Sequence, residues 1–219
     1  MATDDLAAAG TDDPADPPED QEARRAVAAQ LRSLADRLVT DDLPADRWAE
    51  VLQHLEAAAA ALPAEPPGRT RFARDHFELG AGTEDGPSAN HPLGLGTSGV
   101  YPPIEMFHEG DLLVATVAFG PAFEGPPGLV HGGFLAAGFD IILSAMAHHQ
   151  IGTSVTRSLT VRYLKPTLLD VPLRYEIEAG EPEGRLLDLR GTLLADGRVT
   201  MRASAQFASL GHERFGRSS

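Results

Sequence analysis

One apolar stretch, GLVHGGFLAAGFDIILSAMAHHQ at residues 128–150, constrains the fold of this chain more than any other. From residue 131 to about residue 149 it predicts a single long helix, with apolar side chains on every side of the axis. A helix of that kind is buried, so other elements must wrap around it. Residues 129–147 have the length of a membrane span. However, His131, three glycines and Asp140 interrupt them, which favours a buried helix of a soluble protein.

The sequence on both sides of this helix predicts short strands that would cover it. Before the helix, two strands joined by a turn at Glu109-Gly110 predict a hairpin over residues 104–119. After it, alternating apolar and polar residues predict four more strands, with Asp196-Gly197 as a tight turn between the last two. These four strands are 153–164, 171–180, 185–195 and 198–208. The order β-β-α-β-β-β-β predicts an α+β fold in which an antiparallel curved sheet wraps around one long buried helix.

Other segments flank this domain, which we place at residues 103–210. Residues 1–20 hold seven acidic residues and no basic one, and we expect a disordered acidic tail. Apolar residues at helical spacing predict a helical hairpin over 21–63, packed on the main domain or on a partner subunit. The glycines and prolines of 64–102 predict an irregular linker or covering segment, and we expect a flexible tail at 211–219.

Charge and composition argue against several classes of function. The net charge of −14 argues against a nucleic-acid partner. Cysteine is absent, so disulfides and cysteine-based zinc sites are excluded. No cluster of residues has metal-ligand spacing, and we predict no metal. His148 and His149 instead suit the negative end of the predicted helix.

Two further patterns bear on nucleotides and on localisation. The motif GLGTSG at residues 94–99 follows no clear strand and leads into no helix, so we do not assign it to nucleotide binding. The first ten residues, MATDDLAAAG, lack the features of a signal peptide. We therefore expect a cytoplasmic protein that does not bind a membrane.

Asp140 is the one carboxylate in the apolar run. An ionised carboxylate in such a helix is unfavourable unless it is paired or hydrogen-bonded. Desolvation would raise its pKa, and perturbed carboxylates gather at functional sites. The alternative is a structural role in which Asp140 bonds to backbone groups or to an arginine.

The glycines after His131 suggest how a ligand would be held. The first N–H groups of a helix have no partner within the helix and carry the positive end of its dipole. Gly132 and Gly133 would let a ligand oxygen approach those groups closely, as an oxyanion or polarised carbonyl requires. The alternative is a helix start whose glycines only turn the chain, with His131 as a satisfied core residue.

The spacing of His131 and Asp140 adds a constraint on assembly. They are nine residues apart, which is about 13 Å along a helix and half a turn around it. The two cannot reach one small group from the same helix. If both act on one substrate, a second chain must supply one of them. Two antiparallel helices in a symmetric dimer would do so, and the spacing therefore predicts a homodimer with two interface sites.

Two segments, FEGPPGLVHGGFLAAGFD and TRSLTVRYLKP, resemble the PaaI-like branch of the hotdog-fold acyl-CoA thioesterases, in particular members with an EGPPG-x-x-HGG loop. The likeness covers about residues 100–208. It implies a hotdog domain and hydrolysis of an acyl-CoA, or another acyl thioester, to a carboxylic acid and CoA, without a cofactor. It also implies a homodimer, with a homotetramer as a further option.

The resemblance implies roles for individual residues. The N–H of Gly132 polarises the thioester carbonyl, and His131 shapes that site. Asp140 of the other subunit is the nucleophile or the general base for a water. Thr156, sixteen residues after Asp140, orients the water or the carboxylate, with Thr153 and Ser154 as alternatives.

The family pattern also identifies one departure and three candidate ligands for CoA. Many members carry Asn or Gln six residues before the histidine, where this chain has Gly125; Glu124 or the loop backbone would have to compensate. Arg157, Arg162 and Lys165 are candidates to bind the CoA phosphates, although strand arginines commonly face solvent.

Hydrolysis is the function that these residues favour. The alternative is a non-catalytic module that binds acyl thioesters, with the N-terminal helices as an interaction surface. A third reaction, hydration of an enoyl thioester, uses a different Asp/His pairing that is not found in this sequence.

Overall fold

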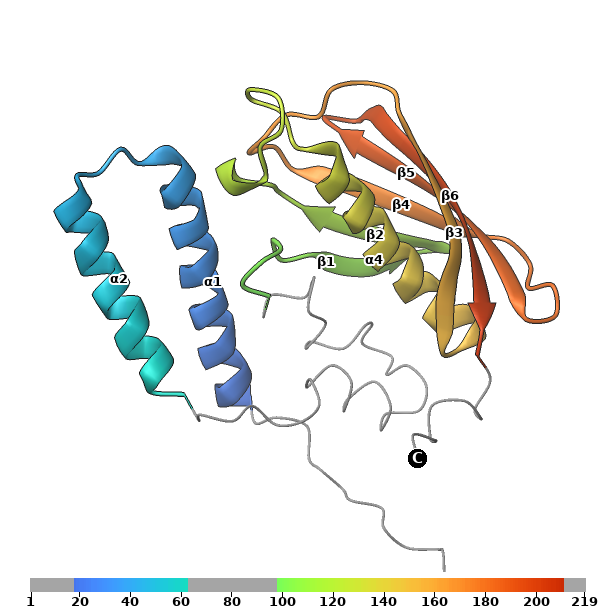
Figure 1. The fold of residues 1–219 in the computed structure, drawn as a ribbon. Coiled ribbons are helices and arrows are strands. Elements are labelled where there is room, and N and C mark those ends of the chain that lie inside the picture. Colours follow the sequence, from blue (N-terminus) through green and yellow to red (C-terminus); the bar gives the residue numbers. More distant parts are fainter. Residues whose placement is uncertain (1–17, 63–97, 211–219) are drawn as a thin grey trace, which may run out of the picture.

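The computed structural model describes residues 18–62 and 98–210, and Figure 1 shows how their helices and strands are arranged. The tails expected at 1–20 and 211–219 and the segment expected at 64–102 lie wholly or largely outside the described residues. Within the described part of the chain, no helix is both long and apolar enough to cross a membrane.

The described residues form two N-terminal helices, a short 3₁₀ helix, a six-stranded sheet and one long helix. In chain order they are α1 (Pro18–Thr40), α2 (Ala45–Ala60), β1 (Glu105–Glu109), β2 (Leu112–Val117), η1 (Pro121–Phe123), α4 (Gly132–Ile151), β3 (Ser154–Tyr163), β4 (Leu173–Ala179), β5 (Leu186–Ala195) and β6 (Arg198–Ser209).

The sheet is antiparallel throughout, with the strand order β1-β2-β4-β5-β6-β3. Strands β1 and β3 are therefore its two edges. Asp196 and Gly197 both have positive φ, 49° and 70°, as the predicted tight turn between β5 and β6 requires. The predicted α+β architecture is confirmed: the sheet curves around α4 in Figure 1.

Helix α4 is fixed against the sheet by close contacts at two glycines. Gly191 of β5 leaves room for the ring of Phe139, because a Cβ atom there would lie 2.6 Å from the Phe139 Cε1 atom. Gly138 leaves room for the hydroxyls of Tyr175 and Tyr101, which would lie 2.5 Å and 2.9 Å from a Cβ. These hydroxyls donate to carbonyls in the first part of α4, and burial raises the pKa of both tyrosines well above the ordinary value.

One face of α4 is less buried than its sequence predicts. Phe139 and Ile142 are fully buried, but a stripe of small residues is only half-buried. Asp140 lies in this stripe and is half-buried too. The sheet of one chain covers one side of the helix, so burial of the apolar run on every side is not achieved within a single chain. The small residues are Ala136, Ala137, Ser144 and Ala145.

The N-terminal helices form the predicted hairpin, and only α1 packs closely on the domain. Helix α1 begins at Pro18, three residues before the Gln21 expected, because proline is tolerated in a first helical turn and acidic residues suit the positive helix end. The Asp36 carboxylate accepts a hydrogen bond from the Ala122 N–H at 2.9 Å. The guanidinium of Arg32 donates to the Ser98 carbonyl. No residue of α2 is buried.

Candidate active site

The loop before α4, residues 124–131, is closed by its own hydrogen bonds. The Gly125 N–H donates to the Leu129 carbonyl at 2.9 Å. The Glu124 carboxylate accepts from the Gly128 N–H at 2.6 Å, and Gly128 has the positive φ of 75° that glycine adopts readily. Glu124 therefore holds the loop in shape.

The end of this loop is anchored on both sides. The His131 N–H donates to the Phe123 carbonyl at 2.8 Å, and the Val130 N–H donates to the Thr167 carbonyl at 2.9 Å. The start of α4 is thus fixed to η1 on one side and to the segment after β3 on the other.

His131 is the N-cap of α4. Its Nδ1 atom accepts a hydrogen bond from the Gly133 N–H at 3.0 Å. Of the two glycine N–H groups expected to face a ligand, that of Gly133 is thus already occupied. The Gly132 N–H has no acceptor among the described residues, as expected for the first residue of a helix. One amide at the positive end of α4 is available to an oxygen.

Tyr163, at the end of edge strand β3, lies over Gly132. Its hydroxyl donates to the Gly132 carbonyl at 2.9 Å. A Cβ atom at Gly132 would lie 2.9 Å from the Cε1 atom of the Tyr163 ring, so a side chain at this position would displace the ring. Sequence reasoning did not assign Tyr163 to the site. The available signal was its place in the segment TRSLTVRYLKP, which carries part of the family resemblance.

Asp140 and Thr156 are joined directly. The Thr156 hydroxyl donates to Asp140 Oδ1 at 3.0 Å. The inward-facing positions of β3 include Thr156, which pairs with the buried Phe207 of β6. Thr156, rather than Thr153 or Ser154, is therefore the hydroxyl residue that meets this carboxylate. Asp140 thus has a hydroxyl partner, where the sequence left a backbone group or an arginine as the partner of a structural aspartate.

Gly132 and Asp140 lie on one regular helix, eight residues apart. At about 1.5 Å per residue their backbones are separated by roughly 12 Å, so they cannot contact one small group from the same chain. Both positions are nevertheless attached to the same strand, since Thr156 and Tyr163 belong to β3.

Gly125 occupies the position where the family pattern has Asn or Gln. A Cβ atom there would lie 2.9 Å from His131 Cα and 3.1 Å from His131 Cβ. The backbone of the loop therefore packs directly against His131. A side chain at Gly125 would displace either the loop or the histidine. Glu124 is engaged with Gly128, as described above.

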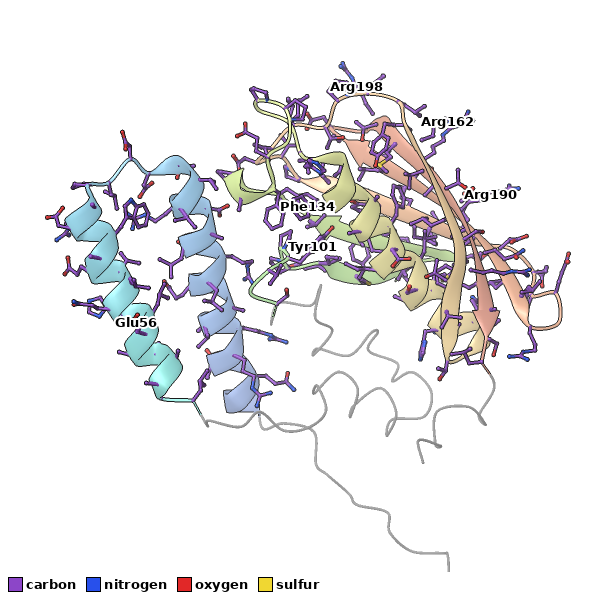
Figure 2. The ribbon with its side chains drawn as sticks, in the orientation of Figure 1. Glu56, Tyr101, Phe134, Arg162, Arg190 and Arg198 are labelled. Carbon is purple, nitrogen blue, oxygen red and sulfur yellow. The ribbon has the colours of Figure 1, made fainter. Side chains whose placement is uncertain are left out.

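The candidate CoA ligands lie apart from one another. Arg162 pairs with Arg202 on the outer face of the sheet, opposite to α4, and Figure 2 shows it pointing outward there. Arg157 donates to Gln206 on the same face at 3.2 Å. Lys165 follows β3, and its N–H donates to the Thr200 carbonyl. Within one chain the structure does not bring the two arginines to the helix side that carries Asp140.

No three His, Asp or Glu side chains gather at a position suited to a metal ion in the described part of the chain. Aromatic residues instead fill the space beside the start of α4. Phe134 packs edge-on against Phe123 with ring centroids 4.9 Å apart, and Tyr101 bonds to the Phe134 carbonyl at 2.7 Å. Figure 2 shows Tyr101 and Phe134 near each other on the side of the domain that faces α1.

Residues 127–201 match the family model of the thioesterase superfamily, a segment that holds all of α4 and most of the sheet. This segment is similar to the thioesterase superfamily, and the domain has the hotdog fold. The chain also shows the fold of a crystal structure described as a thioesterase superfamily protein. The two are 22% identical over 84% of this chain and 94% of the other, with a TM-score of 0.69.

Two other solved structures match about half of the chain. One is a mutant of the phenylacetic acid degradation protein PaaI from Thermus thermophilus, 18% identical over 49% of this chain and 93% of its own, with a TM-score of 0.46. The other is a hypothetical thioesterase from Streptococcus pneumoniae, solved with coenzyme A. It is 21% identical over 49% of this chain and 89% of its own, with a TM-score of 0.47. No curated protein sequence matches the chain significantly.

Proposed function

We propose that this protein hydrolyses acyl thioesters of coenzyme A to a carboxylic acid and CoA. The observation that carries the proposal is the hydrogen bond from Thr156 to Asp140, which orients a half-buried carboxylate on an otherwise apolar helix. The superfamily match of residues 127–201 supports the same class of reaction.

The proposed chemistry uses two groups of α4. The Gly132 N–H donates to the thioester carbonyl oxygen and stabilises the negative charge that develops there. Asp140 accepts a proton from a water whose oxygen bonds to the carbonyl carbon; the C–S bond then breaks, and the thiolate recovers the proton. In the second route Asp140 itself attacks the carbonyl, and water hydrolyses the resulting anhydride. Thr156 fixes Asp140 in both routes.

We further propose that each site is shared by two copies of the chain. The roughly 12 Å between Gly132 and Asp140 supports this arrangement. So does the edge strand β3, whose free side lacks a partner among the described strands. Large apolar side chains are exposed on and just after β3, and a second copy would cover them. These are Val155, Tyr163, Leu164 and Leu168.

The site roles of the remaining residues follow from the same arrangement. Gly133 supplies space and a donor to His131 rather than to the substrate. Lys165 lies two residues before Thr167, which bonds to the loop before α4, and we propose it as a contact for the CoA phosphates at this end of the site. Arg157 and Arg162 lie on the outer face of the sheet, away from Asp140 of their own chain. They could therefore contact the CoA phosphates only at the rim of the shared site or from a neighbouring chain.

The test is release of free thiol from a panel of acyl-CoAs, followed with a thiol reagent. Wild type, Asp140→Asn and Asp188→Asn are compared. Asp188 is the matched control because its carboxylate also accepts a side-chain hydrogen bond, but on the outer face of the sheet. We expect Asp140→Asn to lower kcat by roughly 10²- to 10⁴-fold, the usual contribution of a general base, and Asp188→Asn to leave it nearly unchanged.

The same panel separates hydrolysis from binding alone. If wild type and Asp140→Asn release thiol equally slowly with every acyl-CoA, the enzyme proposal fails. Acyl-CoA binding that persists in that case, measured by calorimetry, would indicate the non-catalytic module instead.

A further inference from the structure

A chain of hydrogen bonds joins Tyr163 to His131 through one peptide group. The Tyr163 hydroxyl donates to the Gly132 carbonyl at 2.9 Å. The N–H on the other side of that peptide belongs to Gly133, and it donates to His131 Nδ1 at 3.0 Å. Because a peptide group is planar and polarisable, a donor on its oxygen fixes and strengthens the donor on its nitrogen.

This arrangement defines the tautomer of His131. A backbone N–H can only donate, so Nδ1 must be the acceptor in this contact. A neutral imidazole with an acceptor at Nδ1 carries its proton on Nε2. The ring lies edge-on against Phe134, with centroids 5.9 Å apart, and its backbone packs against Gly125. His131 is exposed, so the Nε2–H is a donor at the surface.

The Gly132-Gly133 peptide needs an external contact to hold it. Two successive glycines have more backbone freedom than any other pair of residues. The ring of Tyr163 lies within 2.9 Å of where a Cβ of Gly132 would be, and its hydroxyl holds the carbonyl of the same residue. Tyr163 comes from the edge strand β3, which also supplies Thr156 to Asp140.

We propose that Tyr163 is a positioning residue, which fixes the Gly132-Gly133 peptide and through it the orientation of His131. The start of α4 then presents two donors, the Gly132 N–H and the His131 Nε2–H, to one acyl thioester. The use of these donors rests on the proposed function, whereas the hydrogen-bond chain itself does not.

The first experiment measures the chain without any substrate. Full-length protein labelled with ¹⁵N is prepared as wild type, Tyr163→Phe and Tyr101→Phe. Tyr101 is a matched control, because its hydroxyl also donates to a carbonyl of α4, at Phe134, outside the chain that leads to His131. NMR of the histidine nitrogens should show wild-type His131 protonated on Nε2. The Gly133 amide should exchange roughly three- to tenfold faster in Tyr163→Phe, as loss of one hydrogen bond implies, and not in Tyr101→Phe.

Two outcomes would overturn the proposed positioning. One is a neutral wild-type His131 that carries its proton on Nδ1. The other is a Gly133 amide whose exchange is the same in Tyr163→Phe and wild type. Circular dichroism verifies that each variant is folded, and phenylalanine keeps the ring over Gly132, so the loss is confined to one hydroxyl.

The second experiment separates this inference from the proposed function. With the best acyl-CoA of the panel, Tyr163→Phe should lower kcat roughly fivefold with little change in KM, since a misdirected donor weakens transition-state binding. Tyr101→Phe should leave kcat unchanged. Faster Gly133 exchange with an unchanged kcat would refute the catalytic role of Tyr163 alone. Wild type without thioesterase activity would refute the proposed function, and the NMR result would still decide the hydrogen-bond chain.

Discussion

At the scale of single residues, two polar groups of α4 are each held by one side chain from β3. Thr156 holds the carboxylate of Asp140, and Tyr163 holds the carbonyl of Gly132. Both contacts use hydroxyl donors, which have no charge to compete with the substrate. The edge strand is therefore as much part of the site as the helix that carries the reacting groups.

The hydroxyl of Thr156 can be removed without changing the shape of the side chain. Hydrogen bonds to charged groups contribute about 1.5 to 3 kcal/mol. We expect Thr156→Val to lower kcat/KM by roughly tenfold or more, and Thr156→Ser, which retains the hydroxyl, to keep most of the activity. Steady-state kinetics on acyl-CoA measures this. Equal losses in the two variants would mean that packing, and not the hydrogen bond, is what Thr156 provides.

Gly138 is a residue whose replacement should harm stability although helix propensity favours alanine by about 1 kcal/mol. Its Cβ would lie 2.5 Å from the Tyr175 hydroxyl oxygen in a fully buried place. Overpacking of this kind costs about 1 to 3 kcal/mol, so Gly138→Ala should lower the free energy of unfolding in urea. In a double-mutant cycle, Tyr175→Phe should relieve part of that loss. Independent, additive effects would contradict the assigned clash.

At the scale of elements, α1 is an added support for the loop that leads into α4. The Asp36 carboxylate accepts a hydrogen bond from the Ala122 N–H. It also lies close to Gly120, where a Cβ atom would be about 3.0 Å from the carboxylate oxygen. Phe123, the residue after Ala122, accepts a hydrogen bond from the His131 N–H through its carbonyl. Two hydrogen bonds thus connect α1 to the residue that caps α4.

Replacing Asp36 tests whether this support reaches the site. In Asp36→Leu the partly buried Ala122 N–H loses its acceptor, which costs about 1 to 3 kcal/mol of stability. In Asp36→Asn the side-chain carbonyl can still accept, so most of the stability should remain. Urea denaturation measures the stability of both variants. KM for acyl-CoA measures whether the support from α1 reaches the substrate loop. A change in stability with no change in KM would show that α1 stabilises the domain without shaping the substrate loop.

Much of the sheet could be predicted from local sequence. The alternation in β4 and β6 and the Asp196-Gly197 turn depend on neighbours in the chain, and these features are confirmed. The half-buried stripe on α4 was not predicted, because hydropathy shows that a helix face is apolar but not what covers it. Strand order likewise depends on contacts between distant segments.

The site was predictable only where its residues follow a spacing. Thr156 was assigned to Asp140 through the family pattern, and the two are in contact. The occupation of the Gly133 N–H by His131 could not be foreseen, because it depends on a side-chain rotamer at the helix start. Arg162 lies six residues after Thr156, so regular strand alternation would put both side chains on the same face. The register shift between Thr156 and Ser158 places Arg162 on the opposite face, and no local pattern predicts that irregularity.

At the scale of the whole molecule, a shared site predicts complementation between two inactive chains. Asp140→Asn removes one half of each site, and Gly132→Pro removes the amide of the other half. The backbone of a first helical position accepts proline, and the Tyr163 ring that its Cβ would displace contacts Gly132 of the same chain, in the half that is removed. Random pairing of equal amounts should restore about a quarter of wild-type activity, because half the dimers would hold one intact site. Activity of the mixture equal to that of the separate variants, or a monomer by light scattering at micromolar concentration, would contradict the shared site.

Stability in alkaline solution should depend on the two buried tyrosines. Burial raises the pKa of Tyr101 and Tyr175 in the folded state, while in the unfolded chain they ionise near pH 10. Above about pH 10 the unfolded state therefore binds fewer protons, and the free energy of unfolding falls by up to about 1.4 kcal/mol per pH unit for each residue. Urea denaturation between pH 8 and 12 measures this, and Tyr101→Phe should make the decline less steep. An identical slope in that variant would contradict the assignment.

The contact between Phe139 and Gly191 bears on how this protein could acquire a new substrate range. The ring occupies a space that exists only because β5 has no side chain there, so α4 cannot slide along the sheet without a collision. Asp140 follows Phe139 in the chain, and its depth is thus set before any ligand arrives. Natural variation in acyl preference would then accumulate in the surrounding loops, where insertions and replacements do not change the position of the Asp140 carboxylate.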